Sequence, residues 1–410
     1  MSNSGVVAVL RTAQVARVLA ASTVGRIPLA SSPVALLLFA RERWSIGIAG
    51  LLVAGYTVGL AAGGPMLARI ADRWRQPPVM LAGAAVSTAG FLTLAAGDPP
   101  LGLAVPAALL AGAGAPPFES GLRVLWRDLL PESRVHTAYS LDIAVQELIF
   151  IVGPLVSVAA IGAGGPAAGL YATAALQLLG TAWFVTTPAV RRWRGVAAER
   201  HWAGPLRSTP MRLLLVAIVL VGAGVGSLPV AVTRLAEDAG DRAWAGWLLA
   251  AQATGALVGG LVNTRVKLAE RHAPWIAAVL AAGYLPLVLA AAPPVMLPLA
   301  VVSGLALPPL LTATFVTVDR IAPSGTAAEA FAWVATAFTS GAALGAALDG
   351  AILDRTAGVA AGFVLAPVAI AGSAALYRRL ARHLPADLAS SAAAPPSPDR
   401  PFRARNPNAR

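Results

Sequence analysis

The sequence contains no cysteine, which excludes disulfide bonds, thiolate nucleophiles and Cys-ligated zinc. Its four histidines are scattered, so a histidine-based metal site is not expected either. Charged residues are also scarce: they make up 12% of the chain, whereas soluble globular proteins contain about a quarter. A soluble chain of 410 residues could not cover its surface with so few charges.

Apolar residues take the place of the missing charges. They make up 57% of the chain, and the mean hydropathy is +0.71. A membrane-spanning helix needs about 20 mostly apolar residues. None of the apolar runs alternates with period two, so helices are predicted rather than strands. Twelve runs are long enough: 15–40, 47–68, 79–97, 101–124, 138–162, 165–188, 212–234, 243–264, 273–292, 294–317, 327–351 and 357–378.

The basic residues indicate how these runs are oriented. With twelve spans, 25 of the 31 Lys and Arg residues fall on the side that holds both termini and the 189–211 segment. The positive-inside rule makes this side cytoplasmic. The net charge of +12 therefore records orientation, and no nucleic-acid partner is expected, because no basic-aromatic module is present. The usage of 30 Arg against one Lys resembles proteins of GC-rich bacteria, which favours a bacterial plasma membrane.

The two halves of the chain are related by an internal repeat. Pro116-Pro117 aligns with Pro308-Pro309, and Pro131 aligns with Pro323, at the same offset of 192 residues. This offset also pairs Arg73 with Arg265, Tyr139 with Phe331 and Gly153 with Gly345. Both halves start on the same side, so the repeat is parallel. The prediction is an all-α membrane protein with two six-helix bundles related by a pseudo-two-fold axis.

The predicted organisation therefore has five segments. A cytoplasmic N-terminus (1–14) leads into the N-terminal bundle (15–188). A cytoplasmic linker (189–211) leads to the C-terminal bundle (212–378), and a Pro/Ala/Ser-rich tail (379–410) is expected to be disordered and cytoplasmic.

The segment between the second and third runs carries the most informative local motif. It reads ARIADRWRQPP, in which Ala71, Asp72 and Arg73 match the pattern G-x-L-A-D-R-x-G-R-R of the major facilitator superfamily, although other positions of the pattern are replaced. In the second half Gly260 and Arg265 match. The chain thus resembles this family over about residues 10–383. The resemblance implies a transporter in which Asp72, Arg73 and Arg265 form a cytoplasmic gate, with Asp72 accepting hydrogen bonds from a helix N-terminus or pairing with Arg73. An ordinary charge cluster that sets topology is the alternative.

A second, weaker motif lies in the fifth run. Gly153-Pro154 resembles the core of the family's antiporter motif, G-x-x-x-G-P-x-x-G-G, although other residues replace the flanking glycines. The resemblance favours export over import.

Ionisable residues inside the apolar runs are candidate functional residues, because burying a charge in the membrane is costly. Arg26 and Glu147 lie near the middle of the first and fifth runs. We expect them to pair. Three alternatives follow. The two residues form a structural ion pair, or Glu147 is a proton-coupling carboxylate whose pKa is reset by Arg26. In the third alternative, Arg26 is the counter-charge of an anionic substrate.

The fourth run contains a charged pair next to two prolines. Glu119 and Arg123 are spaced i, i+4, and we expect Pro116-Pro117 to bend the helix before them. The family resemblance implies that the first, fourth, seventh and tenth spans line a central cavity. In the tenth span the equivalent positions are Leu311 and Phe315, so this pair is confined to the first half.

Several other residues receive weaker predictions. Gln146 and Tyr56 face either the cavity or neighbouring helices. Asp142 is expected to be solvated or paired with Arg123 or Arg134, while Asp349 and Asp354 are expected at the surface. Gly341 and Gly345, four residues apart, predict close helix packing.

No motif for ATP hydrolysis or for hydrolytic catalysis is present, so we expect a transporter and not an enzyme. The leading expectation is proton-coupled efflux (antiport) of a small organic molecule by alternating access. Uptake or facilitated diffusion, or a non-transporting scaffold or sensor with the same fold, are the alternatives. The expected partners are a small-molecule substrate, protons and the lipid bilayer. We expect a monomer without cofactor or metal.

Overall fold

The structure is a computed structural model that describes residues 4–97, 99–195, 203–241, 243–266, 268, 270–356 and 358–383. Within these ranges every regular element is a helix. The predicted disordered tail from residue 384 onward, and residues 196–202 of the predicted linker, lie outside the described residues.

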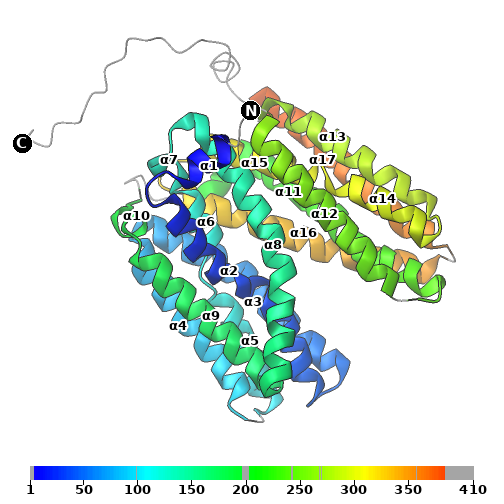
Figure 1. The fold of residues 1–410 in the computed structure, drawn as a ribbon, viewed down its shortest axis with the longest axis horizontal. Helices are drawn as coiled ribbons and strands as arrows, with labels where there is room; N and C mark the ends of the chain where they lie inside the picture. Colours follow the sequence, from blue (N-terminus) through cyan, green and yellow to red (C-terminus); the bar gives the residue numbers. More distant parts are fainter. Residues whose placement is uncertain are drawn as a thin grey trace, which may run out of the picture.

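The first bundle packs six helical spans against one another (Figure 1). Its elements are α2 (Val15–Arg41), α3 (Ile46–Arg73), α4 (Gln76–Ala95), α5 (Leu101–Ala113) with α6 (Phe118–Arg123) and α7 (Trp126–Leu129), α8 (Glu132–Gly164) and α9 (Pro166–Thr186). A short helix, α1 (Ser4–Leu10), precedes the bundle, and α10 (Pro188–Arg192) follows it.

The second bundle repeats this arrangement. After η1 (Gly204–Arg207) its elements are α11 (Thr209–Asp238), α12 (Ala243–Val266), η2 (Glu270–His272), α13 (Ala273–Tyr284) with η3 (Leu285–Leu289), α14 (Pro293–Gly304) with α15 (Leu307–Ile321), α16 (Ala327–Arg355), and η4 (Val359–Val364) with α17 (Leu365–His383).

The predicted number of spans is confirmed, with one shorter than expected. Eleven of the described helical segments are long and apolar enough to cross a membrane, and Ala273–Leu289 is a shorter apolar helix in the ninth position. The sequence predicted that this span would reach residue 292. It ends earlier because Pro286 tightens the last turns into η3, and Ala290 then takes a left-handed conformation with φ 44°.

The two proline pairs interrupt the fourth and tenth spans. The fourth span stops at Ala113 and resumes at Phe118, because Pro116 and Pro117 lack the N–H groups that would continue the helix. The bend predicted at this position is therefore confirmed as a break. In the tenth span the equivalent prolines occupy the first turn of α15, where missing N–H groups are tolerated.

Contacts between repeat-equivalent residues confirm the offset of 192. The Arg123 guanidinium lies 3.8 Å from the centre of the Phe315 ring, and Arg127 pairs with Asp319 at a sequence separation of 192. The rings of Tyr139 and Phe331 lie 6.0 Å apart. Residues that are related by a two-fold axis can touch only if both lie next to it. These three pairs therefore mark where the pseudo-two-fold axis passes between the bundles.

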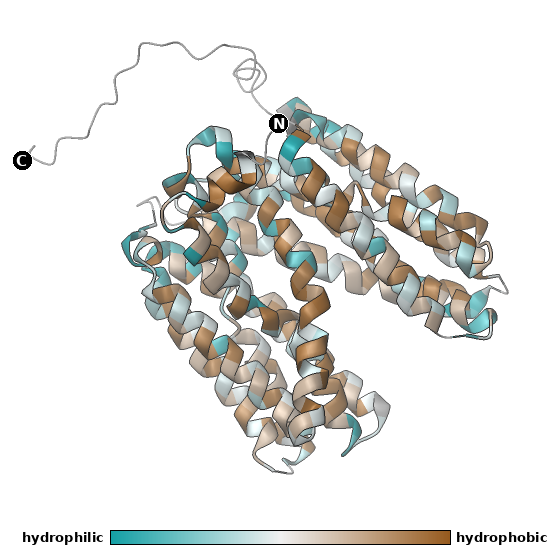
Figure 2. Cartoon of the chain, in the orientation of Figure 1, coloured by the Kyte–Doolittle hydropathy of each residue, from teal (hydrophilic) through white to brown (hydrophobic). Residues whose placement is uncertain are grey.

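The bundles meet at one end and diverge toward the other (Figure 1). We call the end with α1 and the turn from Arg73 to Gln76 the α1 end, and the opposite end, with the turn at Gly164–Pro166, the far end. Figure 2 shows hydrophilic residues gathered at the helix ends, with hydrophobic residues along the spans between them. The helix pairs α3–α16 and α8–α12, which are equivalent in the repeat, join the bundles.

Candidate functional site

A cavity of about 240 Å³ lies between the two bundles. The first bundle contributes side chains of α2, α3, α6, α8 and α9, and the second contributes α15 and α16. Within the described part of the chain no lining residue comes from α11, the seventh span, so that expected contribution is wrong; α3, α8 and α16 take part instead. This volume suits a small organic molecule better than a single water molecule.

The two walls of the cavity differ in chemistry. All of its charged lining residues come from the first bundle: Arg26, Glu119, Arg123 and Glu147. The wall from the second bundle is apolar and aromatic, with Thr336 and Thr339 as its hydroxyl groups. Its larger side chains are Leu307, Leu311, Phe315, Phe331 and Phe338.

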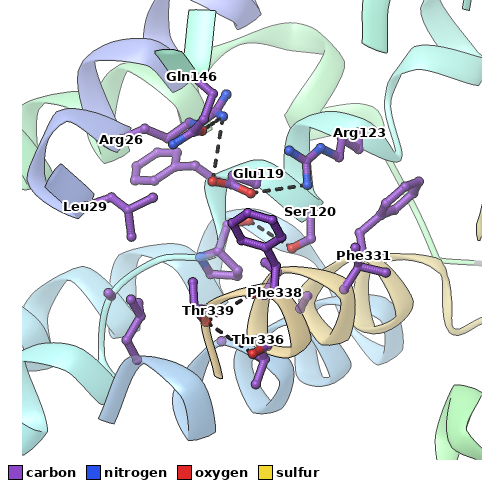
Figure 3. Close-up of a pocket in the computed structure, with 18 of the residues that line it drawn as sticks. Arg26, Leu29, Glu119, Ser120, Arg123, Gln146, Phe331, Thr336, Phe338 and Thr339 are labelled. Carbon is purple, nitrogen blue, oxygen red and sulfur yellow. Dashed lines mark hydrogen bonds and ion pairs between the residues drawn. The ribbon is translucent and has the colours of Figure 1, made fainter. Parts of the chain in front are cut away.

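Four charged side chains form a closed cluster beside the cavity. Asp142 bridges the two arginines, accepting hydrogen bonds from Arg26 Nη1 at 2.5 Å and from Arg123 Nε at 3.0 Å. On the cavity side, Glu119 bridges them again, at 3.7 Å from Arg26 and 3.2 Å from Arg123 (Figure 3). Two positive and two negative charges therefore balance. Gln146 completes the cluster by accepting a hydrogen bond from Arg26 Nη2.

The expected pairing of Arg26 with Glu147 is not what the structure shows. Arg26 pairs with Asp142 instead, and among the described residues no ion pair joins it to Glu147. The reason is helix rotation: five residues along α8 turn a side chain by about 140° away from Asp142. The expected pairing of Asp142 with Arg123 is confirmed, but its expected solvation is wrong, because Asp142 is fully buried.

The packing of α2 explains why the cluster is buried. Arg26 follows Gly25, at which an added Cβ would lie 2.2 Å from the Phe118 ring and which α9 approaches closely at Gly180. Only glycine permits this approach of α6 and α9 to α2. Arg26, Arg123 and Asp142 consequently expose 3% of their surface or less, whereas Glu119 exposes 22% toward the cavity.

Glu147 remains apart from this balanced cluster. Its half-buried side chain lines the cavity, and within the described residues it forms neither an ion pair nor a hydrogen bond. Among the described lining residues, Glu147 is therefore the carboxylate whose neutralisation leaves the charge balance of the cluster unchanged.

Aromatic rings connect the charged cluster to the second bundle. Phe315, which lies under the Arg123 guanidinium, packs edge-on against Phe331, and Tyr139 contacts both rings. Tyr56 is buried at the cavity wall, as one of its two predicted placements requires. Two further lining residues, Gln177 and Phe338, were not predicted, because each lies in an apolar run without a distinguishing pattern.

The predicted gate residues lie at the α1 end. Asp72 accepts hydrogen bonds from the backbone N–H groups of Ala328 at 3.1 Å and Glu329 at 2.8 Å, and so caps the N-terminus of α16. Arg69 donates to the Glu329 carboxylate at 3.1 Å. These contacts join α3 to α16. Arg73 and Arg265 are exposed at the same end.

The equivalent contact in the other half uses different chemistry. The Asn263 amide donates to Ser140 Oγ at 2.9 Å, and Ser140 lies 3.3 Å from Thr312 Oγ1. These bonds join α8 to α12 and α15. Sequence reasoning missed them, although the repeat offset places Asn263 and Thr264 opposite the segment that contains Asp72.

Gly153 and Pro154, the antiporter-like motif, lie where α8 crosses α2. A Cβ on Gly153 would lie 2.6 Å from the Ala30 Cβ, so the glycine allows the two helices to touch. Pro154 lies inside α8.

Asp349 does not lie where the sequence predicted. Asp354 is exposed, as expected, but Asp349 is fully buried between helices of the second bundle. Elsewhere in the described ranges, no group of three or more His, Asp or Glu residues is arranged to hold a metal ion.

Comparison with known proteins shows which of them share this architecture. The family model of the Major Facilitator Superfamily matches residues 18–228. A bacterial homologue of the iron transporter ferroportin, in an outward-facing state, has a TM-score of 0.71 at 14% identity, with 90% of this chain and 99% of that chain covered. The E. coli fucose:proton symporter FucP has a TM-score of 0.71 at 12% identity, covering 89% and 98%. A human organic anion transporter has a TM-score of 0.64 at 13% identity, covering 90% and 98%. No curated protein matches the chain in sequence. Identities this low show a shared fold alone.

Proposed function

Since the chain belongs to the major facilitator superfamily, we propose that it exports a small organic molecule by proton-coupled alternating access. The fold is that of a multi-pass membrane transporter and not of an enzyme. One observation carries the proposal. The cavity between the bundles is lined by Glu147, a carboxylate without an ion partner among the described residues, beside a cluster whose charges balance.

In this proposal the structure is an outward-facing state in the bacterial plasma membrane. The positive-inside rule assigns the α1 end, and with it both termini, to the cytoplasm. Asp72, Arg69 and Asn263 hold the bundles together at this end. The bundles diverge at the far end, which is then periplasmic or extracellular (Figure 1). Transport requires that these contacts break while the far end closes.

Glu147 is the proposed coupling residue. The charges of Arg26 and Arg123 are balanced by Asp142 and Glu119, so proton binding at any of these carboxylates would leave a buried arginine under-compensated. Proton binding at Glu147 instead changes the net charge of the cavity by one without this penalty. The proton and the substrate can therefore influence each other's binding across the same cavity.

The close crossing of α8 and α2 at Gly153 supports export, through its resemblance to the antiporter motif. Uptake or facilitated diffusion is the competing direction. A scaffold without transport activity is less well supported, because it would not need an open cavity lined by a half-buried carboxylate. We propose a monomer as the working unit.

The test is a compound-accumulation screen in cells that express the wild type, Glu147→Gln, or Glu42→Gln as a control at an exposed loop position. We expect lower accumulation of some compounds with the wild type and the control, and loss of this effect with Glu147→Gln. A Glu147→Gln variant with unchanged transport and pH dependence would remove the coupling role. Equal accumulation of every compound in all cells, with each protein present in the membrane, would contradict transport itself.

A further inference from the structure

Asp349 is a buried carboxylate that lies outside the cavity. Its exposed surface is 0%, and neither Oδ1 nor Oδ2 has a hydrogen-bond partner within the described part of the molecule. It belongs to α16, the helix that lines the cavity with Phe331 to Thr339 and carries Glu329 at the α1 end. The proposed transport mechanism makes no use of it.

The packing of α16 on α11 creates this environment. A Cβ on Gly341 would lie 2.2 Å from the Val219 carbonyl oxygen, and one on Gly345 would lie 2.0 Å from that of Ala223. The two helices are thus in backbone contact and run in the same direction. Asp349 lies one turn further along the same stripe of α16, and this stripe faces α11.

A third element covers the carboxylate from the remaining side. At Gly362 of η4, an added Cβ would lie 3.2 Å from Asp349 Oδ2 and 3.2 Å from the Ala231 Cβ of α11. Ser227 lies one turn before Ala231 on α11, and its hydroxyl donates to the Gly224 carbonyl of its own helix at 3.0 Å. The side chain of Asp349 is therefore enclosed by α11, α16 and η4 without a polar partner.

Charged neighbours do not compensate the carboxylate either. On α11 the next charged residue, Arg234, pairs with Asp238 at 2.9 Å. On α16 the next ones, Asp354 and Arg355, are exposed, and η4 has no charged residue. An isolated ionised carboxylate is strongly destabilising in apolar surroundings, and such a group takes up a proton instead.

A metal cation is a poorer fit than a proton. Hard cations are bound by several oxygen atoms, whereas Asp349 has no polar atom of the described residues within hydrogen-bonding distance. A proton needs only the carboxylate itself.

We propose that Asp349 is a proton-binding site, separate from the cavity, that holds α11, α16 and η4 together while it is protonated. Loss of the proton places an unpaired negative charge among these three elements and loosens them. Because α16 also carries the N-terminus capped by Asp72, this loosening reaches a helix that joins the two bundles. The site would make the stability of the second bundle depend on pH whatever the transported substrate is.

The test uses the purified full-length protein and does not require transport. The wild type is compared with Asp349→Asn, a neutral side chain of the same shape, and with Asp354→Asn, which removes an exposed carboxylate of the same helix. The infrared difference spectrum between the wild type and Asp349→Asn should contain the C=O band of a protonated carboxylic acid. The corresponding spectrum for Asp354→Asn should lack this band.

Thermal unfolding gives a second readout. From about pH 4, where an unfolded aspartate ionises, up to the pH at which Asp349 ionises in the folded protein, the wild type and Asp354→Asn should lose stability by up to about tenfold in the folding equilibrium per pH unit relative to Asp349→Asn. A missing carboxylic-acid band, or an equal pH dependence in Asp349→Asn, would overturn the proposal. Stabilisation of the wild type by NaCl but not by choline chloride, absent in Asp349→Asn, would identify a sodium site and overturn it as well.

Discussion

A cross-link between α8 and α12 tests whether the α1 end opens during transport. A Cβ on Gly260 of α12 would lie 3.6 Å from the Ala144 Cβ of α8, within the range of about 3.5–4.5 Å found in disulfides. The same Cβ would lie 3.5 Å from Pro308, an ordinary contact. The chain has no cysteine, so the double variant Ala144→Cys/Gly260→Cys contains only these two thiols. We expect mild oxidation to join them.

The expected size of the effect follows from the geometry. A disulfide keeps the two Cβ atoms within about 4.5 Å, so the helices can separate by only about 1 Å beyond the present distance. Alternating access requires a larger opening at this end. Transport in proteoliposomes or cells should therefore fall in proportion to the cross-linked fraction, measured by the loss of thiol labelling, and a reductant should restore it.

The matched control places a disulfide inside one bundle. A Cβ on Gly55 of α3 would lie 4.0 Å from the Ala108 Cβ of α5, so Gly55→Cys/Ala108→Cys should oxidise equally well. This bond does not cross the interface, and transport should persist. Full transport by completely cross-linked Ala144→Cys/Gly260→Cys would refute opening at the α1 end.

Three further substitutions probe the packing and the charges. Asp142→Asn leaves two buried arginines without the buried carboxylate that bridges them and should lower the free energy of unfolding by about 3–5 kcal/mol. Glu119→Gln, at a partly exposed position, should lower it by less, and thermal unfolding of both variants checks this. Asp72→Asn weakens the charged cap of α16 by about 1–2 kcal/mol, so the α1 end should open more often and the engineered α8–α12 cysteine pair should oxidise more slowly. An unchanged oxidation rate would contradict a gating role for Asp72. Gly345→Ala would place a Cβ 2.0 Å from a carbonyl oxygen and should lower stability by about 1–3 kcal/mol, while Gly350→Ala, with open space around it, should not.

The fold could be predicted because its signals are independent of tertiary detail. Hydropathy locates the spans, and the distribution of arginines between the two sides supports their number. The proline pairs give the repeat offset, which the Arg127–Asp319 and Tyr139–Phe331 contacts confirm. The predicted end of the ninth span, at residue 292, was wrong by a few residues, because the helix ends at Leu289. There the left-handed conformation of Ala290 ends the helix inside an apolar run that hydropathy alone cannot divide.

The site was predicted less completely. Arg26 is conspicuous as a charge in an apolar run, but its partner depends on the rotation of α8, which decides between Asp142 and Glu147. The burial of Asp349 depends on η4, a segment whose sequence is apolar but which lies over α16 only in the folded bundle. Both cases require knowledge of which helix face meets which neighbour, and a single sequence does not contain it.

The contacts on the pseudo-two-fold axis have a consequence for how alike the two halves of the chain can be. A residue on this axis meets its own copy from the other half. In a dimer of two identical N-terminal halves, Arg127 would therefore face a second Arg127, and Arg123 a second Arg123, with the positive charges repelling each other. In the present chain an aspartate and a phenylalanine occupy the opposing positions. The two halves of this chain therefore differ at the positions that meet on the axis, and one half could not replace the other there.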